Sequence, residues 1–339
     1  MSRYGLLTTV GLSDAYGACF EALDPWDAQQ GNTMTGFPQN THFAGTPTDG
    51  IGRYTDDTQL MIGLALFLLS RKDSQDDTAT PAVLANFLVQ AYKRDPRSGY
   101  MPGFRTLLGS CRGGQDFLAK IRPHSEKSGA AMRAGVCGLL DNPQKVVDLA
   151  MWQASLTHAT LPGMVSAAAA AMMVWHCRKG TPVADIPHEI DDLFPNFEFA
   201  TPWTEEVPNL GIPVVRAALT ALQAGSQATI LKTLVDYGGD TDTVAAVAMA
   251  AASQHPDIEA DLPDCLIEKM ERGKYGIAFL ADLDRQLCEK FGLIPPDGVV
   301  PAMVHPPAKP TPPPAPLLQG ADPKKEKDLG GGILDCFFR

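Results

Sequence analysis

The sequence predicts an all-α protein, and three features of its 339 residues support that fold class. Apolar residues recur at helical spacing along most of the chain. Segments such as "MVSAAAAAMMVWHC" and "DTVAAVAMAAASQ" are rich in alanine and methionine, which favours closely packed, buried helices. Stretches in which Val, Ile or aromatic residues alternate with polar ones, as in half-buried strands, are hard to find. We therefore expect many helices around one core.

Ten helices follow from the periodicity, in order along the chain. Two of them are the alanine-rich segments, and another is the apolar run after a pair of aspartates. Joins such as Asn142-Pro143, Leu161-Pro162 and Gly225 stop the helices, so moderate lengths are expected rather than coiled-coil rods. The expected ranges are 5–22, 58–70, 81–93, 129–140, 144–156, 163–178, 213–224, 226–236, 241–253 and 276–290.

Two regions break the helical pattern. Residues 24–54 are rich in Pro, Gly, Thr and Asn and predict a long loop, which inside a compact domain is more often functional than accidental. From Pro301 to Pro316 eight of sixteen residues are proline, which predicts an extended spacer. The expected organisation is a helical domain over 1–297, a Pro-rich linker over 298–320 and a flexible, charged and Gly-rich tail over 321–339.

The tail ends in "ILDCFFR", with a cysteine four residues from the end. Prenylation signals place a cysteine there, but a terminal arginine lies outside their usual set. We expect instead a flexible extension that binds a partner protein or carries a sorting signal, and Pro310 to Pro316 could dock in an aromatic groove.

Composition excludes several classes of partner and site. The chain has 28 basic and 39 acidic residues and a net charge of −11, which opposes nonspecific binding to nucleic acid or anionic membranes and attracts metal cations. Its seven cysteines form no Cys-x-x-Cys pair, so reduced thiols are expected and a zinc site is not. No segment predicts a signal peptide or a membrane span. A cytoplasmic protein is the expectation.

Two acidic motifs precede apolar helices far apart in the chain. Asp56 and Asp57 lie in "YTDDTQL", and Asp240 and Asp242 lie in "GGDTDT". Each motif taken alone fits a helix cap as well as a metal site, because Asp and Thr are favoured at helix starts. Together, four carboxylates with neighbouring threonine hydroxyls match the oxygen ligands that Mg²⁺ and Mn²⁺ prefer, and their charge would balance two divalent ions. Without cations they would repel one another.

A two-metal hydrolase acting on phosphate esters is a rival interpretation of these acids. The Asp-Asp-x-x-Asp pattern of prenyl synthases fails, because Leu60 occupies the position of the third acid.

Both motifs together resemble the metal-binding signature of the ADP-ribosylglycohydrolase family, the relatives of dinitrogenase reductase-activating glycohydrolase. "GLSDAYGACFE", "SGAAMRAGVCGLL" and "LTHATLPGMVSAAAAA" resemble further family segments in the same order, so the likeness covers about 10–293. The chain departs from the family at Ser13 (usually glycine), at Ser128 (usually asparagine) and at Met101, where nitrogenase-activating relatives have an aspartate that meets arginine. The departure at Met101 weakens the prediction of an arginine-linked substrate without excluding it.

The resemblance implies a compact orthogonal multi-helix bundle with a dinuclear metal site. It implies two Mg²⁺ ions, with Mn²⁺ as the other possible metal, that hold the distal ribose through its 2′ and 3′ hydroxyls. Glu21 would lie on a mobile flap or beside the metal ligands. The implied ligands are Thr55, Asp56, Asp57, Asp240, Asp242 and Thr243.

The resemblance also implies where the substrate binds. Arg133 is expected to be structural. From the residues alone, His158 fits a hydrogen-bonded packing histidine better than a functional one, and paired glycines often serve only a turn. The implied substrate-binding residues are Ser128, Gly129, His158, Gly238 and Gly239.

The implied activity is hydrolysis of the C1″–N or C1″–O bond between ADP-ribose and a modified arginine or serine of a protein substrate. Glu21 or Asp57 is the expected catalytic acid-base, because a carboxylic acid beside others can keep its proton at neutral pH. A member of the fold that binds ADP-ribose or a partner without turnover is the alternative.

Overall fold

The computed structural model describes residues 3–38, 52–71 and 80–303. These residues are helical and contain isolated β-bridges but no named strand, so the all-α prediction is confirmed. All of them belong to one compact unit. The elements are α1 (Leu6–Gly17), α2 (Pro25–Gly31), α3 (Asp56–Ser70), α4 (Pro81–Arg94), α5 (Pro102–Ser110), α6 (Gly114–Lys120), the 3₁₀ helices η1 (Ser128–Ala130) and η2 (Ala134–Leu139), α7 (Pro143–Ser155), α8 (Leu161–Lys179), α9 (Ile186–Leu193), α10 (Gly211–Leu222), α11 (Gln227–Asp236), α12 (Thr241–Ala252), α13 (Asp264–Lys269) and α14 (Ile277–Phe291).

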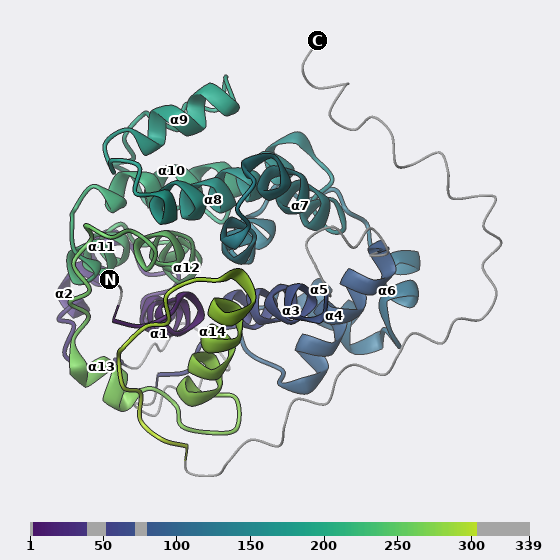
Figure 1. The fold of residues 1–339 in the computed structure, drawn as a ribbon, viewed down its shortest axis with the longest axis horizontal. Coiled ribbons are helices and arrows are strands. Elements are labelled where there is room, and N and C mark those ends of the chain that lie inside the picture. Colours follow the sequence, from purple (N-terminus) through teal and green to yellow (C-terminus); the bar gives the residue numbers. More distant parts are fainter. Residues whose placement is uncertain (1–2, 39–51, 72–79, 304–339) are drawn as a thin grey trace. The chain divides into compact units, whose positions relative to one another are not determined.

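The centre of the core is formed by helices that are buried on all sides. Every residue of α1 and α12 is buried, and α3 and α8 are buried along most of their length. Figure 1 shows α12 between α1 and the pair α8 and α10, and all three contact it. Small side chains allow this approach: a Cβ on Gly17 would lie 2.5 Å from the carbonyl oxygen of Thr241. The close contact brings α1 beside the start of α12.

The predicted α-helix at 129–140 is wrong. The segment forms the two 3₁₀ helices instead, and its glycines explain why. Cβ atoms on Gly135 and Gly138 would lie 2.9 Å from the Ala250 side chain and 2.5 Å from the Ala171 carbonyl. Glycine lowers helix propensity, and here it lets η2 pass closely against α8 and α12. The segment is therefore shaped by its neighbours rather than by its own periodicity.

Five short helices were not expected from the sequence, and they have six to nine residues each. One of them, α2, lies in the predicted loop at 24–54, and its N-cap Asp24 accepts a hydrogen bond from the N–H of Asp27 (2.9 Å). Helices of two turns carry too few periodic positions to be recognised. The others are α5, α6, α9 and α13.

Parts of the sequence prediction concern residues outside the described ranges. These are most of the second half of the 24–54 loop, most of the Pro-rich linker and the whole tail with Cys336. Among the described residues, no helix combines the length and the hydrophobicity needed to cross a membrane.

A buried carboxylate joins α14 to the first turn of α1. Asp284 is 2% exposed, and its oxygens accept hydrogen bonds from the N–H of Leu7 (2.7 Å), the N–H of Thr8 (2.9 Å) and the Thr8 hydroxyl (2.7 Å). Gly5 leaves room for it, since a Cβ there would lie 2.2 Å from Asp284 Cγ. Burial raises the pKa of Asp284 to about 6, although these donors oppose the rise. The carboxyl group is therefore half protonated near that pH.

Asp284 is expected to make the folded state less stable as pH rises. Its folded pKa lies above its unfolded value of 3.8, so the folded state binds the proton more tightly. That advantage is full below the unfolded pKa and is lost as pH rises through the folded pKa. Relative to the Asp284→Asn variant, the free energy of unfolding of the wild type should fall by about 1.4 kcal/mol between about pH 5 and about pH 7.5. Urea unfolding at several pH values measures this difference.

The control for this measurement is Asp282→Asn on the same helix. The Asp282 side chain is 41% exposed, so this variant measures the effect of an Asp-to-Asn change at a surface position of α14. A constant stability difference between wild type and Asp284→Asn across the pH range would show that Asp284 does not titrate in this way.

Candidate active site

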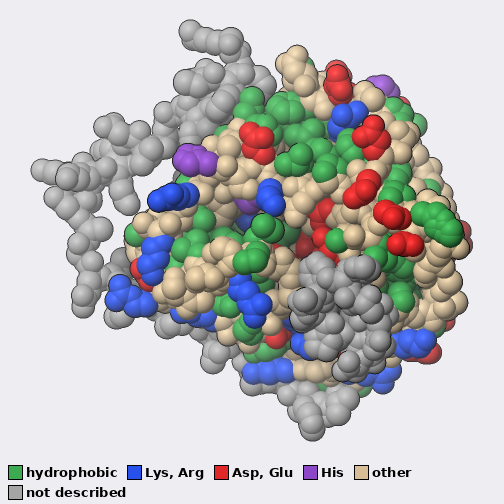
Figure 2. All heavy atoms as spheres, turned by 180° about the vertical axis from the view of Figure 1, so that it is seen from behind, with side chains coloured by type: hydrophobic (Ala, Val, Ile, Leu, Met, Phe, Trp, Pro, Cys, Tyr) green, Lys and Arg blue, Asp and Glu red, His purple; other side chains and the backbone are tan. Residues whose placement is uncertain are grey.

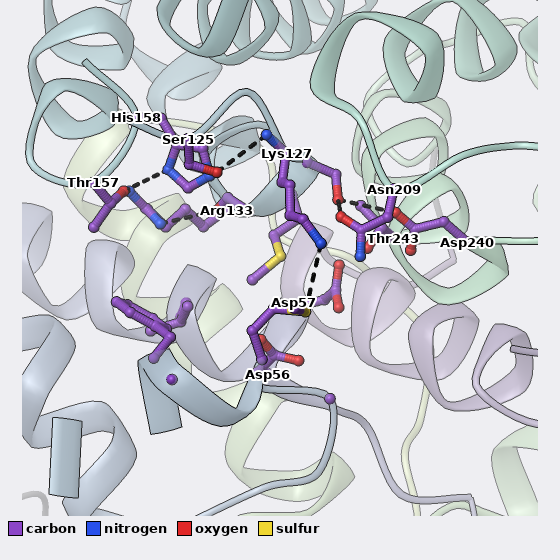
Figure 3. Close-up of a pocket in the computed structure, with 18 of the residues that line it drawn as sticks. Asp56, Asp57, Ser125, Lys127, Arg133, Thr157, His158, Asn209, Asp240 and Thr243 are labelled. Carbon is purple, nitrogen blue, oxygen red and sulfur yellow. Dashed lines mark hydrogen bonds between the residues drawn. The ribbon is translucent and has the colours of Figure 1, made fainter. Parts of the chain in front are cut away.

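The two acidic motifs meet at the starts of α3 and α12. Thr55 is the N-cap residue of α3, and its hydroxyl lies 3.0 Å from Asp57 Oδ2 and 3.5 Å from Asp242 Oδ2. One hydroxyl therefore bridges the motifs, which are 187 residues apart. Figure 3 shows Asp56 and Asp57 on one side of a cavity and Asp240 and Thr243 on the other. The structure thus brings together the acids that the sequence singled out.

Helix capping does not account for these acids. At α12 the N-cap residue is Asp240, and its side chain makes no capping hydrogen bond. At α3 the cap is Thr55, whose hydroxyl accepts from the N–H of Asp57 (3.3 Å). The carboxylates of Asp56 and Asp57 are thus left for another role.

Asp14 of α1 belongs to the same cluster and was missed as a site residue. Its carboxylate accepts hydrogen bonds from the N–H of Thr55 (3.0 Å), the N–H of Thr58 (3.0 Å) and the Thr58 hydroxyl. It is completely buried and holds the start of α3 against α1. One sequence feature could have identified Asp14 as a site residue. It is an acid within a largely apolar predicted helix, where an unpaired carboxylate is costly.

The carboxylates form two overlapping groups. One oxygen each from Asp14, Asp57 and Asp242 lie within 4.8 Å of one another, and the same holds for Glu21, Asp240 and Asp242. Asp242 is common to both groups and therefore stands at the centre of the cluster. Two adjacent groups of this size fit two neighbouring cations.

Burial and mutual repulsion raise the pKa values of this cluster. Burial is the larger cause and the charge of Asp242 the next, and together they raise the pKa of Asp14 to about 7 and that of Asp240 to about 8. The pKa values of Glu21, Asp56 and Asp57 are also raised well above their ordinary range. The carboxylates as a group thus lack compensating positive charge.

The residues present fit divalent cations. No Lys or Arg of the described chain lies within ion-pair distance of Asp14, Asp56, Asp57, Asp240 or Asp242. Asp57 Oδ1 is buried without a hydrogen-bond partner, which is costly unless a cation meets it. Hard oxygen donors of this kind suit Mg²⁺ and Mn²⁺.

Five acids of the cluster line a cavity of about 370 Å³ and form its acidic floor, namely Glu21, Asp56, Asp57, Asp240 and Asp242. Glu21 lines it, and its carboxylate lies in one group with those of Asp240 and Asp242. The apolar residues that line it include Leu60, Phe104, Leu107, Ile121 and Met132.

Positive charge also borders the cavity. Arg122 and Lys127 are exposed and line the cavity. Figure 2 shows basic side chains gathered over the side of the molecule that carries α5 and α6 and acidic ones on the other side. A ligand with a sugar at the floor and phosphates toward the rim would match this distribution.

Ser128 and Gly129 border the cavity. The Ser128 hydroxyl lies 2.9 Å from Asp240 Oδ2 and 3.0 Å from Asn209 Oδ1. Asn209 also lines the cavity and was not predicted, because no motif surrounds it. A Cβ on Gly129 would lie 3.2 Å from His158 Cε1, so glycine leaves room for the histidine ring.

The paired glycines Gly238 and Gly239 lie beside the site and do not line the cavity. Both have positive φ, 69° and 76°. Cβ atoms there would lie 2.8 Å from the Leu23 carbonyl oxygen and 2.2 Å from the Val207 carbonyl oxygen. Their observed contacts are thus with protein backbone, which brings residues 22–23 and 207 against the start of α12.

Arg133 has the structural surroundings expected of it, although its partners are not carboxylates. It is 1% exposed and donates to Gln153 Oε1 (2.6 Å), the Gly129 carbonyl (2.8 Å) and the Thr157 hydroxyl (2.8 Å). Burial lowers its pKa to about 10, so it remains charged at neutral pH.

Gly99 gives Asp56 its position. Gly99 has φ of 97°, and a Cβ on it would lie 1.9 Å from Asp56 Oδ1. The neighbouring Ser98 carbonyl accepts from the N–H of Asp56 (3.0 Å). Gly99→Ala should displace the Asp56 carboxylate and weaken Mg²⁺ binding about 10- to 100-fold, measured by isothermal titration calorimetry.

Gly103→Ala is the matched control for Gly99→Ala. Gly103 also lines the cavity, but a Cβ there would meet no atom within 4 Å. Equal Mg²⁺ affinities for the two variants would contradict the role given to Gly99.

An all-α fold with two buried carboxylate groups below a cavity defines a protein with a candidate dinuclear metal site. The chain belongs to the ADP-ribosylglycohydrolase family, whose sequence model matches residues 3–293. Family members generally use divalent metals, in agreement with this acid cluster.

Similarity to individual proteins agrees with the assignment of the chain to this family. The chain is 31% identical over 215 residues to the ADP-ribosylhydrolase ARH3 of Mus musculus, an alignment that covers 58% of this chain and 54% of that protein. It thus spans about half the length of this curated relative. A solved structure described as an ADP-ribosylglycohydrolase-related protein complex has a TM-score of 0.64 at 22% identity, covering 85% of this chain and 97% of that one, which shows the same fold.

Proposed function

We propose that this protein is a Mg²⁺-dependent ADP-ribosyl hydrolase that cleaves the C1″–N or C1″–O bond between ADP-ribose and a modified arginine or serine. The observation that carries the proposal is the pair of carboxylate groups that share Asp242 at the cavity floor. Family membership and the mouse relative support the reaction class. The charge distribution around the cavity supports a ligand with a sugar at one end and phosphates at the other.

Thr55, Asp56, Asp57, Asp240, Asp242 and Thr243 would hold the two ions, with Mn²⁺ as an alternative metal. Bound there, the ions would polarise water and orient the sugar hydroxyls. Ser128 adds a hydroxyl to this group through its contact with Asp240.

Departure of the modified side chain leaves positive charge on the sugar. The carboxylates below it stabilise that charge electrostatically. Glu21 or Asp57 would protonate the departing nitrogen or oxygen, because both carboxyl groups line the cavity beside the floor. Gly129 and His158 border the same cavity and would contact the ligand away from the broken bond.

A panel of defined substrates tests the proposal. The purified protein with Mg²⁺ should release free ADP-ribose from an arginine-linked or a serine-linked ADP-ribosyl protein, detected by mass spectrometry. EDTA should stop the release, and added Mg²⁺ or Mn²⁺ should restore it, since the acids cannot act without cations. A second panel with other linkages defines the specificity.

A binding protein without turnover is the second candidate, favoured by the departures at Ser13 and Ser128. In that case ADP-ribose would bind with metal present while no linkage in the panel is cleaved. That result would exclude the hydrolase.

We also propose a cytoplasmic location and an ADP-ribosylated protein as the partner. The described cysteines are all unpaired, which suits a reducing compartment.

A further inference from the structure

A threonine and a histidine that follow each other in the chain form a hydrogen-bonded pair beside the cavity. The Thr157 hydroxyl oxygen lies 2.7 Å from His158 Nδ1. Both side chains are buried, at 4% and 8% exposure. Figure 3 shows the pair with Arg133 behind it and the imidazole turned toward the cavity. Either group could donate from the distance alone, so the surroundings decide the direction.

Arg133 determines which group of the pair donates. Its Nη2 donates to the Thr157 hydroxyl oxygen at 2.8 Å, and a guanidinium can only donate. The hydroxyl therefore keeps its own proton for one further hydrogen bond. Within the described residues, His158 Nδ1 is the acceptor within reach of that proton. If Nδ1 carried a proton instead, the buried Thr157 hydroxyl would lack an acceptor, which is unfavourable.

The other ring nitrogen lies on the cavity side. His158 lines the cavity, and its Cε1–Nε2 edge is next to Gly129. No described residue forms a hydrogen bond with Nε2. The imidazole is also uncharged: burial, with a smaller contribution from the Arg133 charge, lowers the pKa of His158 to about 3. A neutral ring carries one proton, so assigning Nδ1 as an acceptor places that proton on Nε2.

We propose that Thr157, itself held by Arg133, is a positioning residue that keeps His158 in the tautomer with the proton on Nε2, so that Nε2–H donates into the cavity. The ligand atom it recognises is therefore a hydrogen-bond acceptor, such as a phosphate oxygen or a ring nitrogen of ADP-ribose. His158 is thereby a fixed donor, and it neither accepts a proton from the substrate nor competes with the carboxylates for metal. The identity of the ligand rests on the proposed function, whereas the tautomer does not.

The tautomer is measured directly by ¹⁵N NMR of the full chain labelled at histidine. The signal of His158, assigned by its loss in His158→Asn, should show a protonated Nε2 and an unprotonated Nδ1. Thr157→Val removes the hydroxyl and should give a mixture of tautomers. Thr157→Ser restores the hydroxyl and should restore the single form. Thr157→Ala serves in place of Thr157→Val if the valine variant does not fold.

ADP-ribose binding in the presence of Mg²⁺ gives the second readout. Thr157→Val should bind about twofold more weakly, because only the molecules with the proton on Nε2 can donate to the ligand, and Thr157→Ser should bind like the wild type. A loss seen with ADP and not with adenosine assigns the acceptor to a phosphate. A loss seen with both assigns it to the base.

The chain offers a matched control in a second threonine–histidine pair. The Thr181 hydroxyl lies 3.1 Å from His176 Nδ1, and neither residue lines the cavity. Thr181→Val should leave both the His158 signal and ADP-ribose binding unchanged.

A protonated Nδ1 in the wild type would overturn the inference. So would a Thr157→Val variant with the wild-type His158 signal. Failure of the proposed function would give a different set of results. The NMR signals would still show the proton on Nε2 of His158, whereas no linkage in the substrate panel would be cleaved.

Discussion

Asp242→Ala is expected to abolish ADP-ribose release, by about 10³-fold or more, while the chain stays folded. Asp242 is the one carboxylate common to both groups of the cluster, so its loss damages both candidate metal sites. Its oxygen also lies within reach of the Thr55 hydroxyl from the other motif. No neighbouring residue of the cluster can take over this shared position.

Removal of Asp242 should also stabilise the protein when metal is absent. Its charge contributes to the raised pKa values of Asp14, Glu21, Asp56, Asp57 and Asp240. Without that charge the remaining acids repel one another less. In EDTA the variant should therefore melt at a higher temperature than the wild type, whereas Mg²⁺ should stabilise the wild type more than the variant.

The comparison uses calorimetric melting with EDTA and with Mg²⁺, together with the release assay. Asp264→Ala is the control, because Asp264 also lies in the first turn of a helix, at the protein surface with 66% of its side chain exposed. If Asp242 served only the start of its helix, the two variants would behave alike. Retained activity in Asp242→Ala would remove the chemical basis of the proposed function.

Arg133→Met is expected to destabilise the fold by about 2 to 6 kcal/mol, because buried carbonyl groups lose their donor. Arg133 is almost completely buried, and its guanidinium donates to acceptors on three residues. Methionine fills much of the same space without donating a hydrogen bond. The Gly129 and Gln153 carbonyls would then be buried without these donors, at a cost of about 1 to 3 kcal/mol each.

Urea unfolding measures this effect, with Arg112→Met as the control. The Arg112 side chain is 92% exposed, so its replacement should change the free energy of unfolding by less than about 0.5 kcal/mol. A loss below about 1 kcal/mol for Arg133→Met would mean that water replaces the guanidinium. The position would then contribute little to the shape of the Gly129 segment.

Local sequence was sufficient for the fold class and for the two acidic motifs. The long helices α3, α8 and α12 are recognisable because each repeats its apolar or small residues over three turns or more. Short helices such as α2 lack those repeats. At residues 128–139 the periodicity predicted an α-helix that does not form. The segment adopts 3₁₀ geometry instead, because Gly135 and Gly138 pack closely against α12 and α8.

The sequence by itself determined the all-α fold class and the presence of carboxylates at the starts of two helices far apart in the chain. Only the tertiary structure decided that these acids share Asp242, that Asp14 and Asn209 belong beside them, and that Gly238 and Gly239 face protein backbone. The reason is physical. Helix periodicity is a property of neighbouring residues, whereas the direction of a buried side chain depends on packing between segments hundreds of positions apart.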